Sequence, residues 1–308
     1  SGCAYHPTLP AVARTVTVDA AKQCRDHAAT MPPLPGRPHC LTSGVGVSGR
    51  GTHDRSGGGD VNKTIGLLIP EFPGQTHNFF WREVEALRDA GANVVLFSTR
   101  RPPTRLQSTT WGTAAAKETT YLYPVSLASI VKLVVNLVGS PARTIRITGL
   151  LWHSLPARTP GTSPLRMFVL LGLGVLLGRA CKARGIDHVH VHSCADAANI
   201  AMFANAFSGL NYSLTLHNPL HVWGGNQKNK WRHAAFGIAI TDWILLDAQR
   251  QLDSALPSRM LIAPMGVNVD VFQRKTAYRP ATDGPTHIFS CARLNPAKGF
   301  TVLLEAIR

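Results

Sequence analysis

The sequence is poor in acidic side chains. Its 308 residues include 17 Asp and Glu against 32 Lys and Arg, which gives a formal net charge of +15 at pH 7. Residues 1–62 hold six basic and four acidic side chains, so residues 63–308 carry a net charge of +13. Such a basic surface favours anionic partners: nucleic acid, acidic lipid or phosphorylated small molecules. No helical stretch combines a run of Lys and Arg with interleaved aromatic residues, so we predict no nucleic-acid partner.

Paired cysteines are also lacking. None of the six Cys residues stands in a CxxC pair, and the chain is too long for a disulfide-stapled miniprotein. This pattern is typical of reduced thiols, so we expect a cytoplasmic protein.

Apolar runs long enough to cross a bilayer are not found. "MFVLLGLGVLLG" is apolar over twelve residues, whereas a spanning helix needs about 20. It belongs to residues 125–184, a stretch that is mostly apolar and predicted to be helical. Within that stretch, "SLASIVKLVVNLVGS" carries one narrow polar stripe on an otherwise apolar helix. Two interpretations stay open: core helices, or a basic, apolar surface that rests on an acidic membrane.

Regular secondary structure is expected after residue 62. Residues 1–62 are rich in Pro, Gly, Ser and Thr and show no period, which predicts disorder. Next, "IGLLIP", a turn, a helix and "NVVLFS" make a βαβ unit, which predicts a parallel sheet. The pattern recurs, so we expect one α/β domain over residues 63–270 with a helical insertion at 125–184. Residues 271–308 are expected to begin a second domain.

Polar residues follow several of the predicted strands. Because the carboxyl ends of parallel strands share one edge, where ligands bind, we expect these residues to meet there. They are Gly74, Gln75, Thr76, His192, Ser193, Asp196, His217, Asn218, His221, Thr241, Asp242, Met265 and Gly266.

Two loops have features of phosphate sites. "FPGQT" precedes a helix whose first N–H groups favour an anion, although a Gly in a tight turn would look the same. Near the end of the sequence, Arg293 and Lys298 follow a predicted strand, with Gly299 beside them. This placement favours a diphosphate clamp over a pair of solvated charges.

The "HVHVH" stretch places three imidazoles on one strand face: His188, His190 and His192. A zinc site is one interpretation, but no Cys or carboxylate completes a metal spacing, so we predict no metal. We expect two of the three to be packing or surface residues. His192 lies nearest the ligand edge and is the functional candidate.

Five stretches together resemble glycosyltransferase family 4. They are "FPGQTHNFFWREVEALRDAGANVVLFSTRRP", "DHVHVHSCADAANIA", "YSLTLH", "APMGVNVDVF" and "FSCARLNPAKGF", in the family's order over residues 64–308. The likeness is to the branch acting in exopolysaccharide or colanic-acid-type synthesis. It implies the GT-B arrangement of two Rossmann-like domains. It also implies retaining transfer of a sugar from a nucleotide-sugar donor to a glycan or lipid-linked acceptor, with no metal and no separate cofactor.

The resemblance also implies residue roles. His192 matches the second His of the family's HxH segment and would act at the transferred sugar as the catalytic residue. Gly74, Arg293 and Lys298 would hold the donor diphosphate, and the two cations would neutralise the leaving group. Sugar or acceptor contacts are expected from Gln75, Thr76, His217, Asn218 and Asp242. His217 lacks the Asp that follows it in the family, because this chain reads "HNPLH".

The sequence departs from the family near its end. The family's second domain continues past the "KG" helix and supplies an E-x7-E carboxylate pair, whereas this sequence stops at Arg308. We therefore expect a complete acceptor-side domain, a donor domain of one strand and one helix, and little or no activity. The alternative is a non-catalytic membrane-surface or interaction domain derived from such an enzyme. The expected location is the cytoplasm, either free or on the inner face of the membrane.

Overall fold

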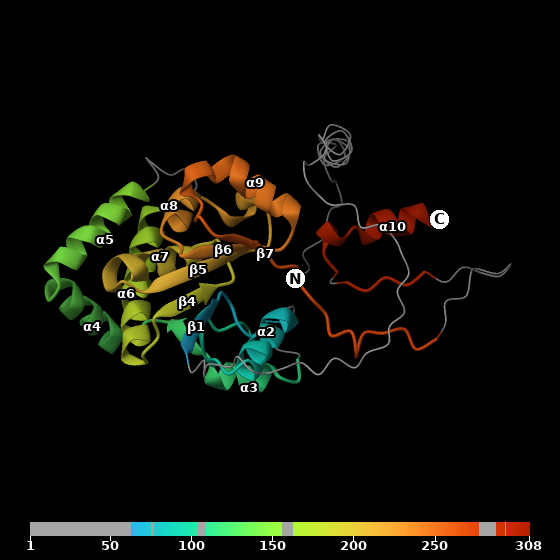
Figure 1. Ribbon diagram of the computed structural model, residues 1–308, viewed down its shortest axis with the longest axis horizontal. Helices are drawn as coiled ribbons and strands as arrows, with labels where there is room; N and C mark the ends of the chain where they lie inside the picture. The colour runs from blue at the N-terminus through green and yellow to red at the C-terminus, as the bar shows by residue number, and fades with distance from the viewer. Residues whose placement is uncertain (1–62, 75–76, 104–108, 156–162, 277–287, 293) are drawn as a thin grey trace, which may run out of the picture. The chain divides into compact units, whose positions relative to one another are not determined.

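The fold is a parallel sheet covered by helices. The structure, a computed structural model, describes residues 63–74, 77–103, 109–155, 163–276, 288–292 and 294–308. Seven parallel strands lie in the order β3-β2-β1-β4-β5-β6-β7 (Figure 1). Their bounds are β1 Thr64–Ile69, β2 Asn93–Arg100, β3 Thr120–Tyr123, β4 His188–Val191, β5 Asn211–Leu216, β6 Phe236–Ala239 and β7 Met260–Ile262. The predicted parallel α/β fold of Rossmann-like type is confirmed.

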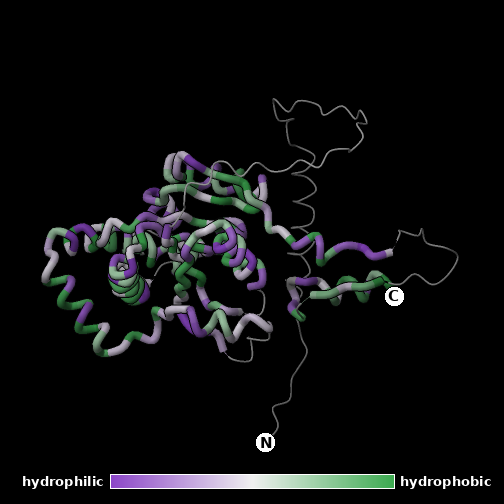
Figure 2. Tube along the Cα trace, turned by 60° about the horizontal axis from the view of Figure 1, so that its bottom comes forward, coloured by the Kyte–Doolittle hydropathy of each residue, from purple (hydrophilic) through white to green (hydrophobic). Residues whose placement is uncertain are grey.

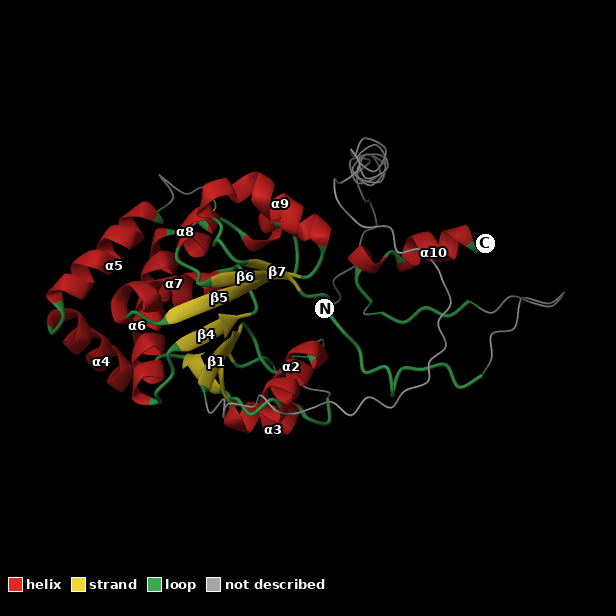
Figure 3. Ribbon diagram, in the orientation of Figure 1, coloured by secondary structure: helices red, strands yellow, loops and turns green. Residues whose placement is uncertain are grey.

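Helices connect the strands and cover the sheet. Hydrophobic residues recur at the centre of the described domain and along the outer helical segments (Figure 2). Figure 3 separates the helices, in red, from the strands, in yellow. The helices are α2 Asn78–Asp89, α3 Gly112–Glu118, α4 Leu127–Val138, α5 Pro141–His153, α6 Pro164–Ala183, α7 Asp196–Ser208, α8 Gln227–Arg232, α9 Asp242–Leu252 and α10 Phe300–Ala306, with short 3₁₀ turns at Leu220–Trp223, Asp253–Ala255 and Pro296–Lys298.

Strand alternation divides the buried residues into two cores. Leu67 and Ile69 of β1 pack with Phe80 and Val84 of α2 on one side of the sheet. Leu68 belongs to the other core, which α6 and α7 dominate. Because neighbouring side chains of a strand point to opposite faces, alternate residues of a single apolar run are buried in the two cores. This explains why "IGLLI" shows no polar position.

The strand order reverses between β1 and β4. The chain runs outward from β1 to β2 and β3, then returns to the other side of β1 and continues from β4 to β7. β4 pairs with β1 in parallel register, with Leu68 opposite Val191. The two carboxyl ends therefore flank a topological switch point, where open α/β sheets form their ligand crevice.

The helical insertion forms three separate helices. Gly139, Ser140 and Pro141 divide α4 from α5, as expected from a helix-ending Gly and a Pro at the first helical position. The third, α6, contains the twelve-residue apolar run but is 20 residues long. Of the described helices it alone has the length and hydropathy to cross a membrane, and half of its apolar window is buried inside the protein. The core interpretation therefore holds for α6, whose buried side packs on α7.

Other elements differ from the sequence-based expectations. The edge strand β3 and helices α3 and α8 were not anticipated. Residues 288–292, expected to form the first strand of a second domain, have no strand conformation, although α10 is helical as expected. The predicted disorder of residues 1–62 lies outside the described residues. The domain boundaries at 62 and 270 stay predictions.

Candidate functional site

His192 lies at the switch point, one residue after β4. Its backbone N–H donates to the Leu68 carbonyl of β1 at 3.2 Å, which continues the β1–β4 pairing by one residue. As predicted, the three imidazoles of "HVHVH" share a face, while Val189 and Val191 enter the opposite core. This face looks toward α2, since the His192 ring lies 4.5 Å from the Phe80 ring.

The three histidines have different surroundings. His188 and His190 bond to hydroxyls of β5: His188 Nε2 lies 2.8 Å from Ser213 Oγ, and His190 bonds to Ser213 and Thr215 at 2.7 Å each. Both are therefore packing residues, as two of the three were predicted to be. His192 is 3% exposed, yet neither ring nitrogen has a hydrogen-bond partner within the described part of the chain. Buried nitrogens of this kind cost stability unless a ligand pairs with them.

Glu83 of α2 faces His192. The distance between Glu83 Oε2 and His192 Nε2 is 3.4 Å. Burial raises the pKa of the Glu83 carboxyl to about 7. Burial, together with the neighbouring His190, His217 and His77, holds the pKa of His192 well below its usual value. At neutral pH the imidazole is therefore neutral, and the carboxyl is poised between its protonated and ionised forms.

His217 connects this cluster to an open hollow. Its ring lies 5.8 Å from the His192 ring, and its Nε2 is also buried without a partner among the described residues. Burial lowers the pKa of His217 to about 4. His217 and Glu83 both line a hollow of about 700 Å³ on the α2 side of β5 and β6, whose outer wall comes from residues 263–270.

The linker after β7 closes one side of this hollow. The Arg82 guanidinium donates to the Gly266 carbonyl at 3.2 Å and lies 5.8 Å from the Phe272 ring. Met265 and Gly266, predicted to reach the ligand edge, both line the hollow. His192 does not line it, because the rings of His217 and Phe80 pack against its imidazole. The side chain that reaches the hollow is therefore His217, whereas the resemblance favoured His192 for direct sugar contact.

Gly74 lies on the same edge of the sheet, after β1. Its N–H donates to His77 Nδ1 at 3.0 Å, so this group is not free for an anion as the sequence suggested. A Cβ at residue 74 would stand 2.8 Å from the His77 ring, so a larger residue here would displace that ring. His77 in turn packs on Phe80, 5.0 Å between ring centres, and Phe80 packs on His192. Two aromatic contacts therefore link Gly74 to His192.

The other predicted contacts are more dispersed. Asp242 is exposed in the first turn of α9, where a carboxylate favours the helix dipole, and Thr241 caps that helix by accepting from the Ile244 N–H at 3.2 Å. Asn218 is exposed, and its carbonyl accepts from Trp223. Lys298 is exposed in the turn before α10. Gln75, Thr76 and Arg293 lie outside the described residues.

A metal-like grouping occurs beside the site. Glu83, His190 and His192 each place one donor atom within 4.8 Å of the others. Both ring nitrogens of His190 already bond to the hydroxyls of Ser213 and Thr215. An ion would have to break one of these buried hydrogen bonds, so the donor set does not suit a metal.

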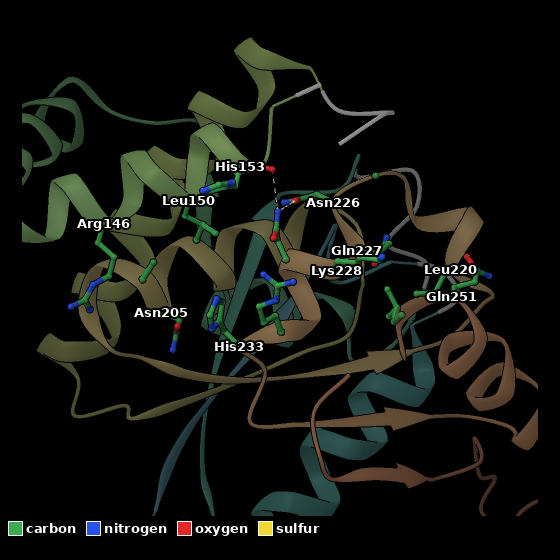
Figure 4. Close-up of a pocket in the computed structure, with 15 residues that line it drawn as sticks. Arg146, Leu150, His153, Asn205, Leu220, Asn226, Gln227, Lys228, His233 and Gln251 are labelled. Carbon is green, nitrogen blue, oxygen red and sulfur yellow. Dashed lines mark hydrogen bonds between the residues drawn. The ribbon is translucent and has the colours of Figure 1, made fainter. Parts of the chain in front are cut away.

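Two further hollows are separate from the His217 hollow, and Asp196, predicted to reach the ligand edge, lines the second of them. One, of about 1050 Å³, is bordered by α5, α7 and α8 and contains none of the predicted site residues (Figure 4). The other, of about 250 Å³, contains the buried amine of Lys230, which donates to the Cys194 carbonyl at 2.8 Å. Burial lowers the pKa of this amine to about 8. The Lys230 amine also donates to the Trp223 carbonyl, so it connects the loop after β4 to the Leu220–Trp223 turn.

Comparison with known proteins gives remote structural likenesses only. A scan against protein-family models and a search of curated proteins each gave no match. A glycosyltransferase from Rickettsia africae ESF-5 is similar in structure with a TM-score of 0.42 and 15% identity, over 80% of this chain and 49% of that one. This chain thus spans about half the length of that protein. A likeness at this level says nothing about the chemistry of the site, so a function must be argued from the residues.

Sequence reasoning missed Glu83. The signal was present, because Glu83 lies three residues after Phe80 and one before Val84, both buried positions of α2. Helical spacing places such a residue beside the core. Glu83 is a site residue only because it lies beside His192 and His217, which follow β4 and β5 more than 100 residues later in the sequence.

Proposed function

We propose that the chain is the acceptor-side part of a retaining glycosyltransferase with the GT-B arrangement. In this proposal it moves a sugar from a nucleotide-sugar donor to a glycan or lipid-linked acceptor in polysaccharide synthesis, in the cytoplasm. The five stretches that resemble glycosyltransferase family 4 support it. So does the parallel pairing of β1 with β4, which brings residues 72–74 of one stretch and residues 188–192 of another to the switch point of the sheet.

One observation carries the proposal. Two neutral imidazoles, His192 and His217, lie at the ligand edge with buried ring nitrogens that have no hydrogen-bond partner in the described part of the chain, and the carboxyl nearest to His192 Nε2, that of Glu83, is 3.4 Å away. Each unpaired buried group costs roughly 1–3 kcal/mol. A hydroxyl-rich ligand in the adjacent hollow would supply a partner to His217, and a sugar is such a ligand.

The proposed roles follow from charge and reach. His217 forms a hydrogen bond with a sugar hydroxyl in the hollow. His192 packs against the His217 ring and holds it in position. Glu83, close to its pKa at neutral pH, accepts a proton from an acceptor hydroxyl, while His192 stays neutral. Arg293 and Lys298 neutralise the departing diphosphate, a role proposed from the resemblance alone.

The binding test uses saturation-transfer NMR with the full chain, because this method detects weak ligands. The ligands are a panel of nucleotide sugars and the corresponding free sugars. We expect saturation on sugar protons more than on nucleobase protons, because the hollow belongs to the acceptor side. His217→Ala should lower the signal several-fold, whereas His233→Ala, an exposed histidine on a different hollow, should not. Absence of sugar saturation for every ligand would refute the proposal.

We propose in addition that the 308-residue chain transfers sugar slowly or not at all. Residues 288–292 form no strand, and α10 has no buried residue, so the described donor-side residues build no packed wall for a nucleotide. A radiolabelled donor assay should give no product above background. Turnover at rates typical of enzymes, at least about 1 per second, would contradict this.

A second candidate is a non-catalytic domain that works at a membrane surface. The exposed apolar side of α4 favours it. Sugar binding at His217 would favour the transferase, whereas vesicle binding without sugar binding would favour the second candidate.

A further inference from the structure

Helix α4 exposes its apolar side. None of its residues is buried. Six large apolar side chains, between 46% and 77% exposed, follow helical spacing along one face: Leu127, Ile130, Val131, Val134, Val135 and Val138. We call these six residues the α4 face. Helices of soluble proteins orient such a face toward the core. The exposed α4 face therefore indicates a surface that binds another molecule.

The side of α4 turned toward the protein carries both polar and apolar residues, and Lys132 of the polar stripe is exposed. Ser129 and Asn136 are half-buried beside the partly buried Leu133 and Leu137. The Arg179 guanidinium of α6 donates to the Asn136 side-chain oxygen, which anchors this side. Figure 1 shows α4 and α5 on the outer side of α6, away from the sheet, and hydrophobic residues recur along this outer segment in Figure 2. A polar anchor therefore holds the apolar face outward.

The segment of sequence that contains the α4 face is cationic. No Asp or Glu occurs in the sequence between Glu118 and Asp187. The same interval contains eight basic residues: Lys132, Arg143, Arg146, Arg158, Arg166, Arg179, Lys182 and Arg184. A second copy of this segment would bring the same positive charge against it, so charge disfavours self-association through this face. An anionic, apolar partner satisfies both features.

A cation-lined hollow lies beside the end of α4. It has a volume of about 330 Å³, and Arg143, Arg179 and Lys182 line it together with Asn136. The guanidinium of Arg143 lies 6.0 Å from the Phe207 ring, which forms another wall. Three cations with no acidic residue in the lining suit a phosphate group.

We propose that the α4 face inserts into the surface of an anionic phospholipid bilayer, and that the exposed cations at the rim of this hollow, Arg143, Arg179 and Lys182, contact lipid phosphates. The helix is about 18 Å long at 1.5 Å per residue, too short to span a hydrocarbon core of about 30 Å. It therefore lies in the plane of the interface, with apolar insertion and phosphate contacts combining. The inference stands independently of the proposed sugar transfer.

Vesicle flotation with the full chain tests the inference. The probes are phosphatidylcholine vesicles with and without phosphatidylglycerol. We expect binding to the vesicles that contain phosphatidylglycerol, weakened when the salt concentration is raised from about 0.1 M to about 0.5 M. Binding to neither vesicle, or equal binding to both, would overturn the proposal.

Paired variants separate local contacts from overall properties. Val131→Asp with Val135→Asp should reduce binding at least about tenfold, whereas Val302→Asp with Leu304→Asp, exposed apolar residues of α10, should not. Arg179→Gln with Lys182→Gln should weaken binding more than Lys228→Gln with Arg250→Gln, although both pairs remove two positive charges. Circular dichroism checks that every variant is folded.

Two outcomes would overturn the proposal. Equal losses in the two charge-removing pairs would assign the binding to net charge rather than to the hollow. Light scattering could instead show a dimer that Val131→Asp with Val135→Asp converts to a monomer, with no vesicle binding. The partner that binds the α4 face would then be a second copy of the chain.

Discussion

His190 and His192 are two residues apart on one strand, yet they differ in their hydrogen bonding. His190 has a hydroxyl on each ring nitrogen, and burial, with the neighbouring His188 and His217, lowers its pKa to about 3. His192 is equally buried but has no hydrogen-bond partner in the described chain. The difference comes from β5, whose Ser213 and Thr215 reach one imidazole and not the other. An unsatisfied imidazole at a ligand edge is the residue-scale feature that points to function.

Glu83 should make stability depend on pH. Its carboxyl has a pKa of about 7 in the folded protein and about 4.5 when exposed. Between these values the folded state keeps a proton that the unfolded state releases, so the unfolding free energy contributed here falls as pH rises from 4.5 to 7. Glu83→Gln cannot lose a proton. We expect the variant to gain stability relative to the natural chain across this window, with a constant difference above pH 7.

Urea unfolding at a series of pH values measures this effect. Glu85→Gln, an exposed glutamate on the same helix, is the matched control and should leave the pH dependence unchanged. A stability difference for Glu83→Gln that does not vary between pH 4.5 and 7 would contradict the assigned pKa.

At the scale of elements, α6 and α7 make the closest helix contact. Gly174 of α6 faces the α7 backbone, and a Cβ there would stand 2.6 Å from Phe203 Cβ and 2.8 Å from the Ile200 carbonyl oxygen. Gly178 faces Ser208 in the same way, at 2.5 Å from its Oγ. The glycines of "LGLGVLLG" therefore allow the two helices to approach, which the sequence alone did not reveal.

Alanine substitutions distinguish packing from helix propensity. Gly174→Ala should destabilise the protein by roughly 1–3 kcal/mol, because the α7 backbone cannot move aside easily. Gly149→Ala, on the exposed side of α5 with nothing within 4 Å, should stabilise it by about 0.5–1 kcal/mol. Thermal and urea unfolding measure both variants. A stabilised Gly174→Ala would show that the α6–α7 contact is looser than described.

At the scale of the whole molecule, burial is concentrated in residues 63–262. The buried hydrophobic residues of both cores come from Leu67 through Ala255. By contrast, α10 has no buried residue, and residues 288–292 are exposed without strand conformation. The stability of the described protein therefore resides in the seven-stranded sheet and its helices.

Removal of residues 288–308 should leave that stability unchanged. We expect the midpoint of thermal unfolding to stay within about 2 °C of the full chain, because no buried apolar area is lost. Circular dichroism at the same protein concentration measures it. A larger decrease would mean that these residues pack on the sheet.

Much of the fold followed from local sequence patterns. Short apolar or alternating runs predicted β1, β2 and β4–β7, and α2 followed from Phe80, Val84 and Leu87. β3 and α3 were missed because "TYLY" has no continuous apolar run and "GTAAAKE" has no apolar residues at helical spacing beyond alanines. The strand expected at 288–292 was wrong, because its apolar residues have no neighbouring strand among the described residues to pair with.

The sequence by itself determined that polar residues end successive strands, and therefore that Gly74, His192 and His217 share one edge of the sheet. Tertiary structure decided which of them can meet a ligand: His217 reaches the hollow, His192 lies beneath it, and Glu83 joins them from α2. It also decided that the α4 face points outward. Periodicity fixes which residues share a side of a helix or strand, but the direction of that side depends on packing between distant segments.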